Sequence, residues 1–295
     1  MIDYADPEVA GYCDVPGGRV WYRINGRDRP GAPLVAITGG PGLSHHYFLP
    51  LLRFAEDRPV VLYDQLDTGN ADRPKDPSNW TLGRPVEELE CLRAALALDR
   101  VIPVGHSWGG LVGYEYALAH PDRCAALMLW SPFLSCARWT ADTRDLIAGL
   151  PDYVQRLIAA CEARGAYDDP AFEHANAMFA KRHVRVVDPR PPELARAASG
   201  FATELYNAVN GPSEFSLSGV VRGYEGIERI GELGMPVLFF CGEHDEARPA
   251  TMREFAGRAP QAEMAEIPGA AHFSLNENPE ATLAVLGDFL ARHGS

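Results

Sequence analysis

The chain has 295 residues, 46% of them hydrophobic, which suits a protein with one large core or with a core and an inserted subdomain. Its formal net charge of -13 predicts a surface that repels phosphate backbones and anionic lipids, so nucleic acid is not an expected partner. The first 18 residues lack both the basic segment and the apolar segment of a secretion signal. No apolar run is long enough to span a membrane. Together these features predict a cytoplasmic protein.

Apolar runs of strand length alternate with longer amphipathic segments along the chain. The expected strands are GRVWYRI (18–24), PLVAIT (33–38), RPVVLYD (58–64), RVIPV (100–104), CAALMLW (124–130), MPVLFFC (235–241) and AEMAEIP (262–268). Helical patterns cover residues 84–98, 111–121 and 279–293. This alternation predicts an α/β protein whose mostly parallel sheet is covered by helices on both faces.

The alternation stops between Leu134 and Phe215. Residues 141–165 and 170–184 have helical spacing, the proline cluster DPRPPE follows at 188–193, and no convincing buried strand intervenes. We therefore expect a helical cap at 134–215, inserted between a first part of the core at 1–133 and a second part at 216–295.

Cysteine and histidine spacing gives no sign of a metal site or of disulfides. The six cysteines form no CxxC pair and no cluster with histidines at zinc-ligand spacing, which predicts reduced, buried thiols. The pair His45-His46 is expected to point in opposite directions and to fill a loop. Asp64, after a strand, is expected to play a structural hydrogen-bonding role.

The segment Gly105-His106-Ser107-Trp108-Gly109 lies between an expected strand and an expected helix. In a G-x-S-x-G turn of this kind the small neighbours permit a tight bend that exposes the serine hydroxyl, and the helix behind directs its N-terminal amides toward developing negative charge. Ser107 is therefore the candidate nucleophile. Pro103, inside the preceding strand, predicts a local defect in the hydrogen-bond ladder.

A serine nucleophile needs a histidine base and a carboxylate that orients the histidine, and in this fold they follow in that order after later strands. Asp245 follows the run at 235–241 and His272 follows the run at 262–268, so they are the candidate partners. His244 should point away from Asp245, and His120 ends a helix before Pro121.

An oxyanion hole requires two backbone amides. One should come from Trp108, directly after the serine, and the other from the loop AITGGPG, where we assign Gly40 as the second donor.

The sequence resembles the proline iminopeptidase family of α/β hydrolases along nearly its whole length, in particular the tricorn-associated aminopeptidases. The resemblance rests on GGPG (39–42), YDQLDTGNADRP (63–74), GHSWGG (105–110), NGPSEF (210–215) and GEHDE (242–246). It implies an α/β-hydrolase fold with a catalytic triad of Ser107, Asp245 and His272 and an oxyanion hole of Gly40 and Trp108. It also implies that Glu214 and Glu246 hold the free amino group of the substrate, with Tyr206 nearby.

Two positions depart from the family pattern. The family usually has histidine where this chain has Thr38, and Gly-Ser-Gly where it has Asp67-Thr68-Gly69. Both departures fall in loops that border the expected site. The family also includes amino acid amidases and relatives that act on small amides or esters.

We therefore expect a serine hydrolase that removes N-terminal residues, proline or other small or apolar ones, from short peptides or amino acid amides through an acyl-enzyme. Its partner is a small substrate with a free amine, and neither a cofactor nor a metal is expected. The alternatives are an esterase, lactonase or natural-product amidase with the same triad, or a ligand binder. The preferred residue and the oligomeric state stay open.

Overall fold

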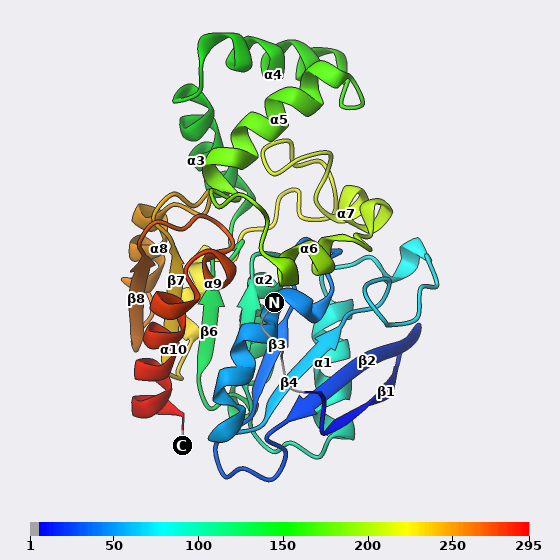
Figure 1. Ribbon diagram of the computed structural model, residues 1–295, viewed down its shortest axis with the longest axis vertical. Coiled ribbons are helices and arrows are strands. Elements are labelled where there is room, and N and C mark those ends of the chain that lie inside the picture. Colours follow the sequence, from blue (N-terminus) through cyan, green and yellow to red (C-terminus); the bar gives the residue numbers. More distant parts are fainter. Residues whose placement is uncertain (1–5, 295) are drawn as a thin grey trace.

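The computed structural model describes residues 6–294, which form an eight-stranded sheet in the order β1-β2-β4-β3-β5-β6-β7-β8 (Figure 1). β1 and β2 form an antiparallel hairpin, β2 is antiparallel to β4, and all the remaining pairs are parallel. The strands are β1 (Val9–Val15), β2 (Gly18–Asn25), β3 (Leu34–Ile37), β4 (Val60–Asp64), β5 (Ile102–His106), β6 (Leu127–Trp130), β7 (Val237–Gly242) and β8 (Ala262–Ile267). The predicted mostly parallel sheet is confirmed, whereas β1 was not predicted.

Helices cover both faces of the sheet (Figure 1). One face carries α1 (Arg84–Ala95), α2 (Trp108–Ala119) and α8 (Pro249–Ala256). The other carries the 3-10 helix η1 (His45–Glu56) and α10 (Pro279–His293), with the short α9 (Ser274–Glu277) beside them. Alternate side chains of β3 lie on opposite faces of the sheet. Val35 and Ile37 pack into one hydrophobic core, and Leu34 and Ala36 pack into the other.

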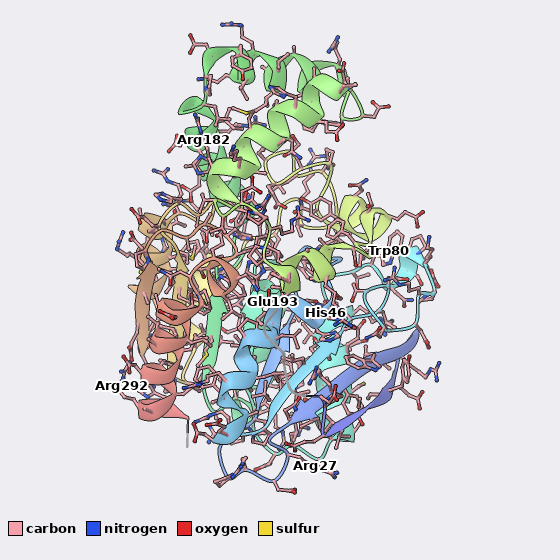
Figure 2. All side chains as sticks on the ribbon, viewed as in Figure 1. Arg27, His46, Trp80, Arg182, Glu193 and Arg292 are labelled. Atoms are coloured by element: carbon pink, nitrogen blue, oxygen red, sulfur yellow. The ribbon has the colours of Figure 1, made fainter. Side chains whose placement is uncertain are left out.

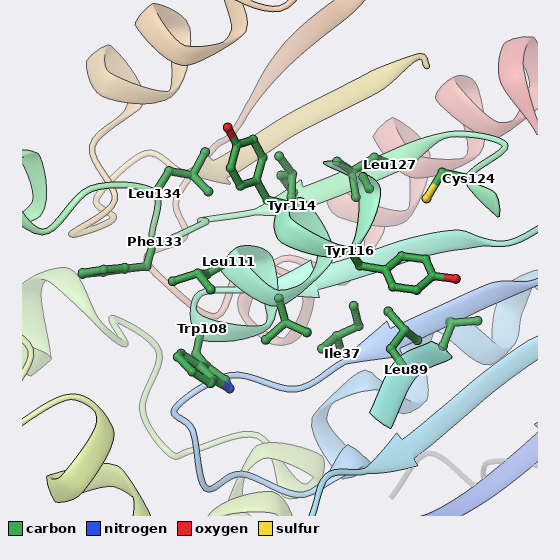
Figure 3. Packing of buried hydrophobic residues seen from close by; sticks show 14 of the residues in the cluster. Ile37, Leu89, Trp108, Leu111, Tyr114, Tyr116, Cys124, Leu127, Phe133 and Leu134 are labelled. Carbon is green, nitrogen blue, oxygen red and sulfur yellow. The ribbon is translucent and has the colours of Figure 1, made fainter. Parts of the chain in front are cut away.

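The helix that follows Ser107 lies deep in the first of these cores. Figure 3 shows Trp108, Leu111, Tyr114 and Tyr116 of α2 among buried apolar side chains from neighbouring elements. All four are fully or almost fully buried. Burial on several sides explains why α2 is apolar around most of its circumference and why its N-terminal end has a fixed position.

The ladder defect predicted at Pro103 is present. Val101 bridges to Cys124, whereas Val104 pairs with Met128, so β6 advances by one more residue than β5 over the same span. Proline has no N–H to donate, so the hydrogen-bond ladder is interrupted at Pro103. The extra residue on the β6 side lets the parallel pairing resume after the interruption.

Five α-helices lie between β6 and β7, and Figure 1 shows α3, α4 and α5 as a layer beyond the sheet. Pro151 divides the helical pattern at 141–165 into α3 and α4. Phe215 and buried residues of α4 and α5 form a small core of their own. The helices are α3 (Cys136–Ala148), α4 (Asp152–Arg164), α5 (Pro170–His183), α6 (Pro192–Ala198) and α7 (Thr203–Val209).

The remaining 3-10 helices are η2 (Pro77–Asn79), η3 (Pro121–Arg123) and η4 (Ile227–Glu232). Across residues 6–294, no helix is both long enough and apolar enough to cross a membrane.

Candidate active site

Ser107 occupies a strained turn between β5 and α2. Its φ of 55° and ψ of -115° are unusual for a residue with a side chain. A Cβ atom at Gly105 would lie 2.1 Å from the carbonyl oxygen of Gly109, and one at Gly109 would lie 2.1 Å from that of Ile37. The two glycines therefore allow the turn to close against itself and against β3, which is the physical reason for the G-x-S-x-G spacing.

His272 and Asp245 form a buried pair. Nδ1 of His272 lies 2.8 Å from Oδ1 of Asp245, which also accepts a hydrogen bond from the Ala247 amide. Oδ2 of Asp245 accepts hydrogen bonds from Ser131 Oγ at 2.5 Å and from the Gly242 amide at 3.2 Å. Burial lowers the pKa of His272, but the charge and hydrogen bond of Asp245 raise it more, so the pKa lies above its usual 6.5.

Ser107 and His272 line one cavity of about 570 Å³, between the sheet and the inserted helices. Gly40, Tyr206 and Glu214 line the same cavity. The Oγ atom of Ser107 makes no hydrogen bond to any residue within 6–294. Catalytic hydrogen bonds often become short only when substrate is bound, so an open serine is compatible with attack on a substrate carbonyl.

The two expected oxyanion donors have free backbone amides. Neither the N–H of Gly40 nor that of Trp108 donates to another residue of the described range. Gly40 has a φ of 110°, which a residue with a side chain rarely adopts. Both amides are therefore available to a ligand oxygen.

The structure brings the three residues proposed for amine binding close to His272. Tyr206 donates a hydrogen bond of 2.8 Å to Oε1 of Glu214. Glu246 is only 1% exposed and does not itself line the cavity, yet its Oε1 lies 3.8 Å from Nε2 of His272. Neither carboxylate oxygen of Glu246 has a hydrogen-bond partner within residues 6–294.

Burial dominates the electrostatics of this acidic pair. It raises the pKa of Glu246 well above 4.5, and the charges of Glu214 and Asp245 raise it further. Burial also raises the pKa of Glu214, against the opposing influence of His272 and Tyr206. Because an unpartnered buried carboxylate is costly, the pair is a site that a cation would stabilise.

Sequence reasoning missed a set of hydrogen bonds that connects the loops of the site. Nε2–H of His106 donates to the carbonyl oxygen of His272, and Tyr47 Oη lies 3.2 Å from Nδ1 of His106. The same hydroxyl accepts from the Gly39 amide at 2.7 Å. Burial and the nearby His272 hold the pKa of His106 well below 6.5, so its neutral ring accepts the Tyr47 hydroxyl proton. The oxyanion loop is thereby connected to the loop that carries His272.

The two departures from the family pattern have local partners. Thr38 accepts hydrogen bonds at its carbonyl and hydroxyl oxygens from Nε2 of Gln65, whose Oε1 accepts from the Trp108 indole. Asp67 has a φ of 68° and accepts from the Lys75 amide and the Trp80 indole. Both side chains therefore hold loops beside the turn that carries Ser107, and neither lines the cavity.

The other polar residues considered in the sequence lie outside the cavity. Asp64 accepts hydrogen bonds from the backbone and ring of His45, which confirms its structural role. The expectation that His45 and His46 point in opposite directions is wrong: they begin η1, and their rings stack with centroids 4.1 Å apart. His244 is exposed, and the His120 ring packs near Tyr116.

No group of three or more metal-binding side chains occurs within the described range. All six cysteines, which lie inside this range, are free, although Cys91 and Cys136 are only partly buried.

Comparisons with known proteins agree with this architecture. A family model for the alpha/beta hydrolase fold matches residues 32–279. A proline iminopeptidase of Heyndrickxia coagulans is 38% identical over 281 residues, which cover 95% of this chain and 98% of that protein. The crystal structure of a proline iminopeptidase from Mycobacterium smegmatis matches with a TM-score of 0.88 at 30% identity, over 97% of this chain and 98% of that one. The crystal structure of VinJ matches with a TM-score of 0.92 at 29% identity, over 98% and 100%.

Proposed function

This chain belongs to the proline iminopeptidase family of the α/β hydrolases, and we propose that it is a serine aminopeptidase. Its substrates are short peptides or amino acid amides with a free amine, from which it releases the N-terminal residue, proline or another small or apolar one. Ser107, His272 and Asp245 are the proposed triad. That the enzyme works in the cytoplasm stays a prediction from the sequence.

The observation that carries the proposal is the unpartnered carboxylate of Glu246 beside His272. In an N-terminal residue only one Cα atom separates the amine from the scissile carbonyl. An enzyme that recognises the amine must therefore place its negative charge next to the triad. Glu246 meets this requirement, and Glu214 supplies a second carboxylate in the cavity wall. Bound as the ammonium ion, the amine gives a counter-charge to the buried Glu246 and to the partly buried Glu214.

The proposed reaction has two halves. Ser107 Oγ attacks the carbonyl of the first residue, and Nε2 of His272 takes its proton. The N–H groups of Gly40 and Trp108 stabilise the oxyanion. His272 then gives the proton to the leaving amine, which departs as the shortened peptide. Finally, water, activated by His272, hydrolyses the acyl-enzyme and releases the amino acid.

We further propose that residues 134–215 act as a cap that limits access to the cavity. The cavity wall includes Ala177, Ala180, Leu194 and Phe201 from this segment. A site roofed in this way admits the end of a short peptide and excludes folded proteins.

Steady-state kinetics on three matched substrates test the proposal. We expect the enzyme to cleave prolyl or alanyl arylamides, and to cleave their N-acetylated forms poorly, since acetylation removes the charge that Glu214 and Glu246 would recognise. A simple aryl ester has no amine, so its rate of hydrolysis measures the triad without amine recognition. Ser107→Ala is the inactive control. Equal rates on free and acetylated arylamides would contradict the proposal and favour the esterase or amidase alternative.

A further inference from the structure

The wall of the catalytic cavity carries three cations in addition to Glu214. Lys181 lies in the last turn of α5, and Arg185 and Arg190 lie in the segment between α5 and α6. Lys181 and Arg190 are exposed, which places them at the mouth, whereas Glu246 and His272 are buried. In a chain with a net charge of -13, a group of cations at this position calls for an explanation.

Ion pairing does not explain the group, and the helix end accounts only for Lys181. Lys181 and Arg190 form no ion pair within residues 6–294. Arg185 donates to the carbonyl oxygen of Val187. The C-terminal end of α5 attracts cations in general, but Arg185 and Arg190 lie beyond it. Asp188 is the one acid near them in the cavity wall, so cations outnumber acids at the mouth.

The segment that bears these cations is fixed to the loop of the proposed catalytic histidine. Oε1 of Glu277 accepts hydrogen bonds from the amides of Val186 and Val187, at 2.5 and 3.1 Å. Oε2 of Glu277 accepts from the amide of Ala271, next to His272, at 2.7 Å. One carboxylate thus holds the cation-bearing segment in a defined position relative to the triad.

We propose that Lys181, Arg185 and Arg190 form a subsite for the C-terminal carboxylate of a short peptide. This inference rests on the proposed function, because it places the amine of the same substrate at Glu214 and Glu246. A peptide at neutral pH is negative at its carboxyl end and positive at its amino end. The cavity has the complementary arrangement, with acids beside the triad and cations at the mouth. The preferred substrates are therefore short peptides with a free C-terminus.

The test compares two peptides with the same sequence, one a free acid and the other a C-terminal amide. We expect the wild-type enzyme to have a higher kcat/KM for the acid. Since a partly exposed charge pair contributes about 0.2 to 1 kcal/mol, the Lys181→Ala/Arg190→Ala double variant should reduce the acid-to-amide ratio by about two- to twentyfold.

Arg182→Ala is the matched control. Arg182, labelled in Figure 2, belongs to the same helix end. It donates to the carbonyl oxygen of Gly149 and does not line the cavity. This variant should keep the wild-type ratio. Ionic strength gives a second readout that needs no variant: the wild-type ratio should fall between about 0.01 and 1 M salt, as the Debye length shrinks from ~30 to ~3 Å.

The outcomes separate this inference from the proposed function. If free-amine arylamides are cleaved and the wild-type acid-to-amide ratio is near one, the carboxylate subsite is wrong and the aminopeptidase stands. A ratio that the double variant leaves unchanged also overturns the subsite. A C-terminally amidated peptide that ends in glutamate tests whether a side-chain carboxylate can replace the C-terminal one. If it is cleaved as fast as the free acid, the assignment of the subsite to the C-terminal carboxylate is wrong. If the wild type cleaves no free-amine arylamide, both proposals fail.

Discussion

Replacing Glu246 by glutamine isolates its negative charge. The side chain is 1% exposed and its oxygens have no hydrogen-bond partner in the described structure, so the substitution breaks no internal hydrogen bond and keeps the volume. A hydrogen bond to a charged group contributes about 1.5 to 3 kcal/mol, and each 1.4 kcal/mol is about tenfold. We therefore expect kcat/KM for a free-amine arylamide to fall by about ten- to a hundredfold.

The second acid of the pair should be less sensitive. Oε1 of Glu214 already accepts from Tyr206, and an amide oxygen can keep that bond, so Glu214→Gln should have a loss near the lower end of the same range. Glu243→Gln is the matched control, because Glu243 belongs to the same loop as Glu246 but is exposed. The assay is kcat/KM for a prolyl arylamide and for a small uncharged aryl ester. Equal losses on both substrates, or no loss for either glutamine variant, would refute the reasoning.

The Glu246→Gln variant should also change the pH dependence of stability. The folded-state pKa of Glu246 is raised by burial, so its contribution to stability is fully present below the unfolded value near 4.5 and is lost as pH rises toward the folded pKa. Glutamine cannot ionise. The melting temperature of Glu246→Gln should therefore exceed that of the wild type by a margin that grows as pH rises above about 4.5. A difference in melting temperature that is constant with pH would show that ionisation of Glu246 does not destabilise the folded protein.

Three further predictions concern the triad and the cap. Ser131→Ala removes a hydrogen bond to Asp245 and should lower kcat by about two- to tenfold, equally for arylamide and ester; a loss on only one substrate would contradict a role in orienting Asp245. Because Asp245 raises the pKa of His272, and the base must be neutral, kcat/KM for the ester should rise with pH through a midpoint above 6.5; Asp245→Asn should move that midpoint downward, and an unmoved midpoint would argue against the assignment. Limited proteolysis should cut residues 134–215 before the sheet, since α4 and α5 have a separate small core; early cuts in the strands would contradict the proposed division.

The fold and the G-x-S-x-G turn at Ser107 could be predicted because the sequence patterns that indicate them are local. Glycines that flank Ser107, an apolar strand before it and a helix after it all lie within one short stretch. Parallel strands also place the loops after β5, β7 and β8 at one edge of the sheet, so the order of Ser107, Asp245 and His272 along the chain was enough to expect them together. Even the irregularity at Pro103 follows from its missing N–H.

The supporting contacts could not be predicted because their partners are distant in the sequence. Ser131 and Asp245 are 114 residues apart, and Tyr47 and His106 are 59 apart. No periodicity or motif joins such pairs, since the packing of separate elements creates them. Strand β1 was missed for another reason: it pairs only with β2 at the sheet edge, and glycine and aspartate interrupt its apolar pattern.

The central claim is that the enzyme works from the free amino end of a peptide, and mass spectrometry of a digested pentapeptide tests it most directly. The account predicts products shortened by one residue at a time from the amino end, no cleavage of the same peptide after N-acetylation, and no products with Ser107→Ala. Cleavage inside the peptide or from its carboxyl end, or equal shortening of the acetylated peptide, would contradict it.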